Sequence, residues 1–95
     1  MRITINDKLR ILKYRNADEV QKIKVQLAKT VLICRKERHI SQKQLSEITG
    51  IPQADISRLE SGEANPTLDK IYRIANAFDM NVKLTFEPKI VSEYV

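Results

Sequence analysis

Apolar residues recur three and four positions apart along most of this chain, the spacing that places side chains on one face of an α-helix. Three segments show this spacing: residues 20–38, 41–62 and 67–78. The middle segment divides at Gly50, so four helices are expected. The residues expected on the apolar faces are Val20, Ile23, Leu27, Val31, Cys34, Leu45, Ile48, Ile51, Ile56, Leu59, Leu68, Ile71, Ile74, Ala75 and Phe78.

The middle segment carries signals for the ends of two short helices. Ser41 and Gln44 have the capping-box spacing, in which a hydroxyl and a side-chain amide each bond a free backbone N–H. Gly50 suits the left-handed residue that ends the first helix. Pro52 suits the start of the second helix, where no N–H is lost, and Gly62 suits its end. Two short helices set at an angle around a tight turn are typical of the helix-turn-helix, whose second helix enters the major groove of DNA.

The outer helical segments have end signals too. Residues 16–18 are expected to break the regular structure, with Asp18 as the N-cap of the first long helix and Gln21 three positions on. His39 follows the last turn of that helix, where a left-handed conformation is expected. Thr67 caps the final helix after an Asn-Pro turn, and Asp79 ends it.

Alternating apolar and polar residues near the C-terminus predict a short strand. Val82, Leu84 and Phe86 occupy one side of it, and Pro88 closes it. A single strand is not stable alone. It therefore requires either the segment near Ile3 or the same strand of a second subunit.

The N-terminal region is less clearly patterned. Residues 2–6 alternate and suit a strand, whereas residues 8–15 fit either a strand or one helical turn. We divide the chain into a basic arm at 1–17, a helix-turn-helix domain at 18–88 and a tail at 89–95, for which no structure is predicted.

Length and composition limit the function classes. The chain has 95 residues, enough for one domain with a small core. It holds one Cys and one His, which indicates a reducing, cytosolic compartment and disfavours a structural zinc site. No apolar run reaches the length of a membrane span. No nucleophile with a base, carboxylate pair or phosphate-binding loop is found, so neither an enzyme nor a cofactor is expected.

The net charge of +5 suits a polyanionic partner, but the charge is unevenly placed. Residues 1–40 hold 11 Lys and Arg against 4 Asp and Glu, whereas residues 41–95 hold 6 against 8. The basic excess therefore precedes the helix-turn-helix. Two interpretations stay open: these side chains attract phosphates, or they form solvated faces.

Several short motifs together resemble one family. They are Arg35, Ser41-Gln42, Leu45-Ser46, Gly50-Ile51, Ile56-Ser57-Arg58, Glu60-Ser61-Gly62, Asn65-Pro66 and Ile74-Ala75. With them, residues 20–88 resemble the Xre/phage-repressor helix-turn-helix family, most closely its HigA-type antitoxin branch. The resemblance implies a mainly α, lambda-repressor-like bundle of four or five helices, with a short C-terminal strand and room for an N-terminal one, usually dimeric.

The resemblance also assigns roles to residues. Gln53 is the candidate for reading adenine and Arg58 for guanine or a flanking phosphate, with Ala54 and Ser57 beside a thymine methyl or a sugar. Gln42 is expected to donate to a phosphate. The further candidate backbone contacts are Lys43, Ser61 and Asn65. The residues expected at the dimer interface are Val82, Leu84 and Phe86.

Two features of the family pattern concern structure. It pairs Arg35 with Glu60 as an ion bridge between the first helix and the end of the recognition helix. It usually has a Ser N-cap where this chain has Pro52, so Asp55 is expected to accept a free N–H in its place.

The partners implied are double-stranded DNA with a palindromic operator, a second copy of the chain in a homodimer and, for the antitoxin branch, a RelE/HigB-like toxin protein. The alternative is a stand-alone Xre-type regulator without a toxin. Residues 1–17 favour that alternative, because five basic side chains against one acidic are unsuited to covering a basic toxin.

Overall fold

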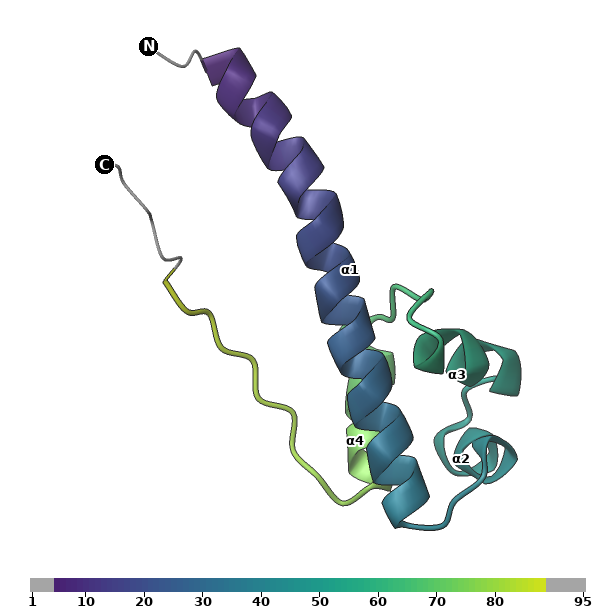
Figure 1. The fold of residues 1–95 in the computed structure, drawn as a ribbon. Helices are drawn as coiled ribbons and strands as arrows, with labels where there is room; N and C mark the ends of the chain where they lie inside the picture. The colour runs from purple at the N-terminus through teal and green to yellow at the C-terminus, as the bar shows by residue number, and fades with distance from the viewer. Residues whose placement is uncertain (1–4, 89–95) are drawn as a thin grey trace.

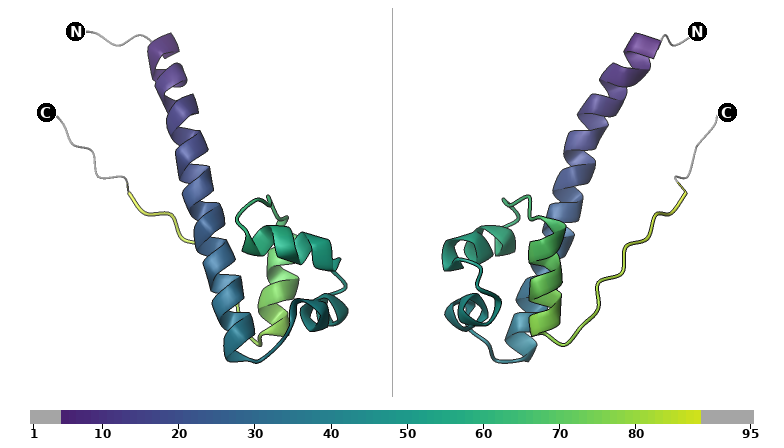
Figure 2. Two further views of the ribbon diagram at one scale, coloured as in Figure 1. Left: turned by 45° about the vertical axis from the view of Figure 1, so that its right-hand side comes forward. Right: turned by 180° about the vertical axis from the view of Figure 1, so that it is seen from behind.

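The computed structural model describes the backbone of residues 5–88 and the side chains of residues 18–88. The described part contains four helices, which are α1 (Ile5–Glu37), α2 (Gln42–Thr49), α3 (Gln53–Glu60) and α4 (Leu68–Ala77). Figure 1 shows α2, α3 and α4 gathered around the C-terminal half of α1. The N-terminal half of α1 extends beyond this helical body, and Figure 2 shows the same extension from two further sides.

One hydrophobic core holds the body together. All four helices contribute to it, and α3 supplies Ile56 and Leu59. Leu45 and Ile56 are fully buried, which makes them the centre of the packing. The other buried members are Val31, Cys34, Ile51, Ile74 and Phe78. Ile48, predicted on the apolar face, is instead 59% exposed. An eight-residue helix has only two turns, and Leu45 already occupies the inward side of α2.

The predicted helix ends in the body are confirmed. The Ser41 hydroxyl accepts from the Gln44 N–H at 3.0 Å, and the Gln44 side chain accepts from the Ser41 N–H at 2.8 Å. Gly50 has φ 76°, the left-handed value that glycine adopts without strain. The Thr67 hydroxyl accepts from the Lys70 N–H at 3.2 Å at the start of α4.

Two non-glycine residues also take left-handed conformations, and for His39 this was predicted. His39 has φ 53° after α1, and Asp79 has φ 58° after α4. In each case a nearby backbone N–H satisfies a terminal carbonyl: Ile40 donates to Arg35 at 3.1 Å, and Met80 donates to Ala75 at 2.9 Å. The helix ends are therefore closed by hydrogen bonds that offset the cost of positive φ.

The break expected at residues 16–18 is wrong. α1 is continuous from Ile5 to Glu37, so Asp18 lies inside the helix and caps nothing. Asn and Asp are weak helix formers, but each costs only about 0.7 kcal/mol at most, and neither Gly nor Pro interrupts the segment. Residues 8–15 take the helical alternative. Of the strand expected at 2–6, residues 5 and 6 are helical and residues 2–4 lie outside the described part.

The C-terminal strand is not formed in the described residues. Residues 80–88 have no regular secondary structure, and every residue from 81 to 88 is exposed. A lone extended segment has no ladder partner for its N–H and C=O groups, so the prediction depends on a second strand that one chain does not supply here. The tail at 89–95 lies outside the described part.

Candidate functional site

The turn between α2 and α3 is fixed by hydrogen bonds rather than by packing alone. The Gly50 N–H donates to the Ser46 carbonyl at 2.8 Å. The Ser46 hydroxyl donates to the Ile51 carbonyl at 2.6 Å, and the Ile51 N–H donates to the Thr49 hydroxyl at 3.2 Å. Ile51 is also buried. Hydrogen bonds and apolar packing therefore fix the angle between α2 and α3 together.

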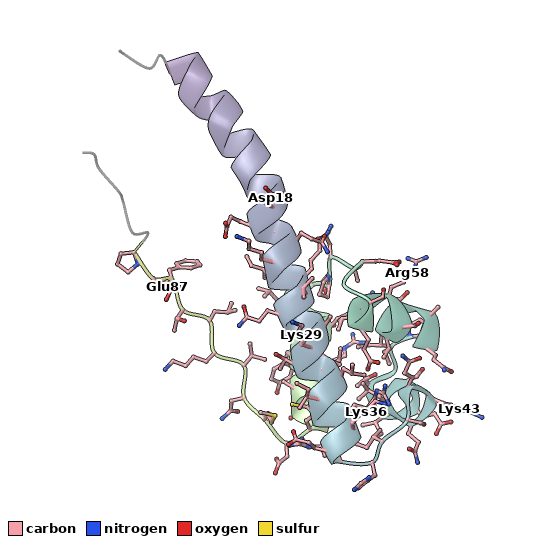
Figure 3. All side chains as sticks on the ribbon, viewed as in Figure 1. Asp18, Lys29, Lys36, Lys43, Arg58 and Glu87 are labelled. Atoms are coloured by element: carbon pink, nitrogen blue, oxygen red, sulfur yellow. The ribbon has the colours of Figure 1, made fainter. Side chains whose placement is uncertain are left out.

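α3 has two chemically different faces. Ile56 and Leu59 are buried against the rest of the body. The opposite face is entirely exposed and carries Gln53, Ala54, Ser57 and Arg58. In Figure 3, Arg58 and Lys43 project from the α2–α3 side of the molecule, away from α1. The structure therefore brings the four residues assigned to base contacts onto one accessible surface.

Arg35 and Glu60 join α1 to the end of α3. The Arg35 Nε and Nη2 atoms donate to the two carboxylate oxygens of Glu60 at 2.7 and 2.9 Å, a bidentate pair. The two side chains are only 12% and 6% exposed. Arg35 Nη1 also donates to the Ile40 carbonyl at 2.9 Å, so the same guanidinium anchors the chain that enters α2.

The charges of this pair are stabilised mutually. Burial opposes ionisation of Glu60, but hydrogen bonds from Arg35 and Gln42, with the charges of Arg35 and Lys36, outweigh it and lower the pKa of Glu60. The hydrogen bond to Glu60 raises the pKa of Arg35 against the opposing effect of burial. Both groups therefore stay ionised, and their charged hydrogen bonds hold the end of α3 against α1.

Gln42 has a contact that the sequence did not indicate. Its Nε2 donates to Glu60 Oε1 at 3.0 Å, so the residue assigned to a phosphate also joins the Arg35–Glu60 pair. A side-chain amide has two N–H donors and an acceptor oxygen, so this bond leaves a further donor for another ligand. No spacing rule links position 42 to position 60. Their contact depends on the angle between α2 and α3, which only the structure supplies.

The capping role expected for Asp55 is wrong. α3 has no side-chain cap, and Asp55 Oδ2 instead accepts from Lys70 Nζ of α4 at 3.1 Å. The competing partner is a full positive charge, which attracts a carboxylate more strongly than a backbone N–H does. Both side chains are more than one-third exposed, so this pair adds little stability.

The candidate backbone contacts surround α3. Lys43 and Asn65 are exposed, as is Ser61 just beyond the helix. The Ser61 hydroxyl donates to the Arg58 carbonyl at 2.8 Å, which closes the end of α3. All three residues lie within the α2–α3 region or the loop that follows it.

Other site types find no support in the described residues. None of their His, Cys, Asp and Glu side chains form a group of three or more that could hold a metal ion. Over the same part of the chain, no helix combines the length and the apolar character that crossing a membrane requires.

The sequence is similar to those of two curated proteins. A curated Haemophilus influenzae protein described as an uncharacterized HTH-type transcriptional regulator is 34% identical over 61 residues, 62% of each chain. Repressor protein C of Escherichia phage P2 is 31% identical over 48 residues, which cover 50% of this chain and 48% of the repressor. The chain thus matches between about half and two-thirds of the length of these relatives.

A solved structure and a family model agree with these matches. The crystal structure of an HTH_3 family transcriptional regulator from Vibrio cholerae has a TM-score of 0.63 and 27% identity, and the match covers 65% of this chain and 35% of that one. The HTH_3 helix-turn-helix family model matches residues 32–84, from the end of α1 through α4 into the extended segment. The chain therefore belongs to the HTH_3 helix-turn-helix family.

Proposed function

We propose that this protein is a sequence-specific DNA-binding transcriptional regulator that represses the gene or genes it controls. The observation that carries the proposal is the exposed face of α3, where Gln53, Ala54, Ser57 and Arg58 lie together. The names of the relatives, a transcriptional regulator and a phage repressor, support the same function.

The side chains on this face suit base recognition. Gln53 begins α3, where a side-chain amide can bond both N6 and N7 of adenine. Arg58 lies five positions on, also exposed, and offers the forked donor that guanine or a phosphate accepts. Ala54 and Ser57 are small, so the helix can approach the floor of a major groove closely. The buried Arg35–Glu60 pair keeps this surface in one orientation.

Phosphate contacts around the groove complete the proposed interface. Gln42 and Lys43 lie at the start of α2, and the exposed Ser61 and Asn65 lie in the chain that follows α3. Contacts of this kind set the register of a protein on DNA without reading its sequence. We assign these four residues to the DNA backbone.

The test begins with selection of a preferred site from a random DNA pool. Gln53→Ala should then weaken binding to that site by about 1–3 kcal/mol and change binding to random DNA little, because the substitution removes only base readout. Asn76→Ala, which truncates an exposed amide on α4, is the matched control. An equal weakening on both DNAs would remove Gln53 from base readout, and absence of any preferred site would defeat the proposal.

Assembly is a separate part of the proposal. We propose a homodimer on a palindromic operator, with Val82, Leu84 and Phe86 at a subunit interface. Leu84 is 70% exposed and Phe86 is 103% exposed, so a second strand would cover apolar surface that the single chain leaves open. Two recognition helices about 34 Å apart would enter successive major grooves.

The more specific proposal is a HigA-type antitoxin that represses its own operon and neutralises a toxin encoded beside it. A specific observation favours the stand-alone regulator instead: residues 1–17 carry five basic side chains and one acidic. Co-expression with the neighbouring reading frame separates the two. Co-purification of a small basic protein whose toxicity is suppressed supports the antitoxin, and its absence supports the stand-alone regulator.

A further inference from the structure

α1 carries an apolar stripe whose surroundings differ from one end of the helix to the other. Val31 and Cys34 are buried in the core of the body, and Leu27 is half-buried at its edge. Farther toward the N-terminus, Val20 is 44% exposed and Ile23 is 63% exposed. The stripe therefore continues past the body, onto a part of the helix that no other element of the described chain covers (Figure 1).

The positions of the stripe follow a symmetric pattern. At 100° per residue, positions spaced three and four apart share one helix face. From the N-terminus the positions on this face are Ile5, Leu9, Leu12, Asn16, Val20, Ile23 and Leu27. Their spacings are 4, 3, 4, 4, 3 and 4, which read the same from either end. Asn16 is the midpoint and the one polar member.

This symmetry has a geometric consequence for two copies of the helix. In an antiparallel pair, residues at the same height have numbers with a constant sum. A two-fold axis beside Asn16 makes that sum 32, so Leu12 meets Val20, Leu9 meets Ile23 and Ile5 meets Leu27 of the other copy. Every apolar position in the stripe then has an apolar partner, and the two Asn16 residues meet each other.

We propose that this stripe is an interaction surface for a second copy of the chain, with the two α1 helices packed antiparallel about a two-fold axis at Asn16. The overlap from residue 5 to residue 27 is about 34 Å long at 1.5 Å per residue. A single polar residue in such an interface fixes its register, because each Asn amide can donate to and accept from the other.

Charge supports the antiparallel direction over the parallel one. Residues 5–15 hold Lys8, Arg10, Lys13 and Arg15 against Asp7, a net +3, whereas in residues 17–27 two acidic and two basic residues cancel. A parallel pair would place +3 beside +3. The antiparallel pair places +3 beside a neutral segment, and Arg15 then lies on the same flank as Glu19 of the other copy, about 3 Å apart in height.

Helix stability gives a further reason for a partner. In water a helical segment of 12–15 residues is marginal on its own, and most helical stability comes from packing an apolar face. In Figure 2 the ribbon of the N-terminal part of α1 extends away from α2, α3 and α4. The second copy supplies the missing packing.

This surface is distinct from the strand interface at residues 82–86, although the two are neighbours. Met80 Sδ lies 3.7 Å from Cys34 Sγ, so the extended C-terminal segment starts at the buried end of the same stripe. The inference concerns assembly without DNA and does not depend on the proposed regulatory function.

Mass in solution tests which surface joins the subunits. By light scattering at micromolar concentration, Ile23→Lys should halve the mass of the wild-type dimer while circular dichroism shows the body still folded. Ile33→Lys is the matched control, because Ile33 is 56% exposed on another face of the same helix, and it should stay dimeric. A monomeric wild type, an unchanged mass for Ile23→Lys, or an equal fall in mass for both variants would overturn the proposal. If Leu84→Lys alone gives a monomer, the strand carries the dimer instead.

Crosslinking tests the direction of the helices. In a Cys34→Ala background, Leu9→Cys and Ile23→Cys chains are treated with a short thiol-specific crosslinker, each alone and as a mixture. The antiparallel pair predicts a crosslinked dimer only in the mixture. Crosslinks within each single variant would show a parallel pair, and no crosslink in any sample would show that the stripe does not pair; either result overturns the proposal.

Discussion

The two halves of α1 belong to one helix and one apolar stripe, yet they differ in what surrounds them. In the C-terminal half, Ala28, Val31 and Cys34 are buried, and Val31 and Cys34 pack in the core with residues of α2, α3 and α4. Nearer the N-terminus of α1, Val20 and Ile23 are exposed to solvent. The helical periodicity of apolar residues is the same in both parts of α1. Periodicity shows which residues share a helix face, but it does not show what covers that face.

The two parts of α1 also differ in the polar contacts that they make. The buried half is tied to its neighbours by specific polar contacts, including the Arg35–Glu60 pair and the bond from Arg38 Nε to the Phe78 carbonyl at 3.2 Å. Farther along the helix, Gln21 reaches the Gly62 carbonyl at 3.3 Å, and the stripe beyond it has no such bonds among the described side chains. Substitutions in the two halves should therefore report on different equilibria, folding in one and association in the other.

The largest effect is expected where the buried half is held by charge. Arg35→Ala should lower the free energy of unfolding by about 3–5 kcal/mol, because it leaves the Glu60 carboxylate buried without its partner. In that background Glu60→Ala should add much less, since the two side chains act as a unit. Urea denaturation of the four proteins of this double-mutant cycle measures the coupling. If the two effects are additive, the pair does not hold α1 against α3.

Acid should weaken the same contact. The pKa of Glu60 is lower in the folded protein than in the unfolded chain, where a glutamate has a pKa of about 4.3. The stability gained is therefore complete above the unfolded value and is lost as the pH falls through the folded value. Denaturation measured from pH 6 down to pH 3 should show a steeper acid loss in the wild type than in Glu60→Gln. Parallel pH profiles would contradict this assignment.

A pair of truncations compares the buried and the exposed parts of the apolar stripe directly. Val31→Ala should cost roughly 2 kcal/mol of unfolding free energy, because it leaves a cavity in the core. Ile23→Ala should change the stability of the isolated body by no more than about 0.5 kcal/mol. Denaturation at two protein concentrations gives the sharper result. The Val31→Ala destabilisation should not depend on concentration, whereas any Ile23→Ala destabilisation should grow with it, since only association involves that residue.

The helix-turn-helix was predictable from sequence because its signals are local. Ser41 with Gln44, Gly50 and Thr67 each act through their own backbone or through residues three or four positions away. The same holds for the left-handed His39 and Asp79, which end helices. A residue that bonds one nearby backbone group can be recognised in the sequence without knowing how the rest of the chain folds.

The rest could not be predicted because it depends on distant partners. The break expected at residues 16–18 rested on weak local preferences, and α1 runs through these residues because neither Gly nor Pro interrupts the segment. Asp55 was expected to bond its own helix but bonds Lys70 of α4, and Gln42 bonds Glu60 across the turn. The strand at 82–86 has no partner within the described chain, so its pattern alone could not determine its structure.

The smallest effect is expected from charge in the N-terminal half, and it distinguishes phosphate binding from a solvated face. Replacing Lys8, Arg10, Lys13 and Arg15 by Gln removes four charges from residues 1–17 without shortening the helix. If these side chains reach DNA, the slope of log K against log salt should flatten by about 0.9 for each phosphate that the variant no longer neutralises. The preferred DNA sequence should stay the same, because phosphates carry no base information.

The control for this last measurement lies in the other half of the same helix. Lys22→Gln with Lys29→Gln removes exposed charges of the same kind beside the body, and it should leave the salt slope nearly unchanged. An unchanged slope in the four-site variant would assign the basic N-terminal half to solvent or to the second copy rather than to DNA. Equal flattening in both variants would indicate long-range attraction from net charge, in which case the two halves of α1 do not differ in how they bind phosphate.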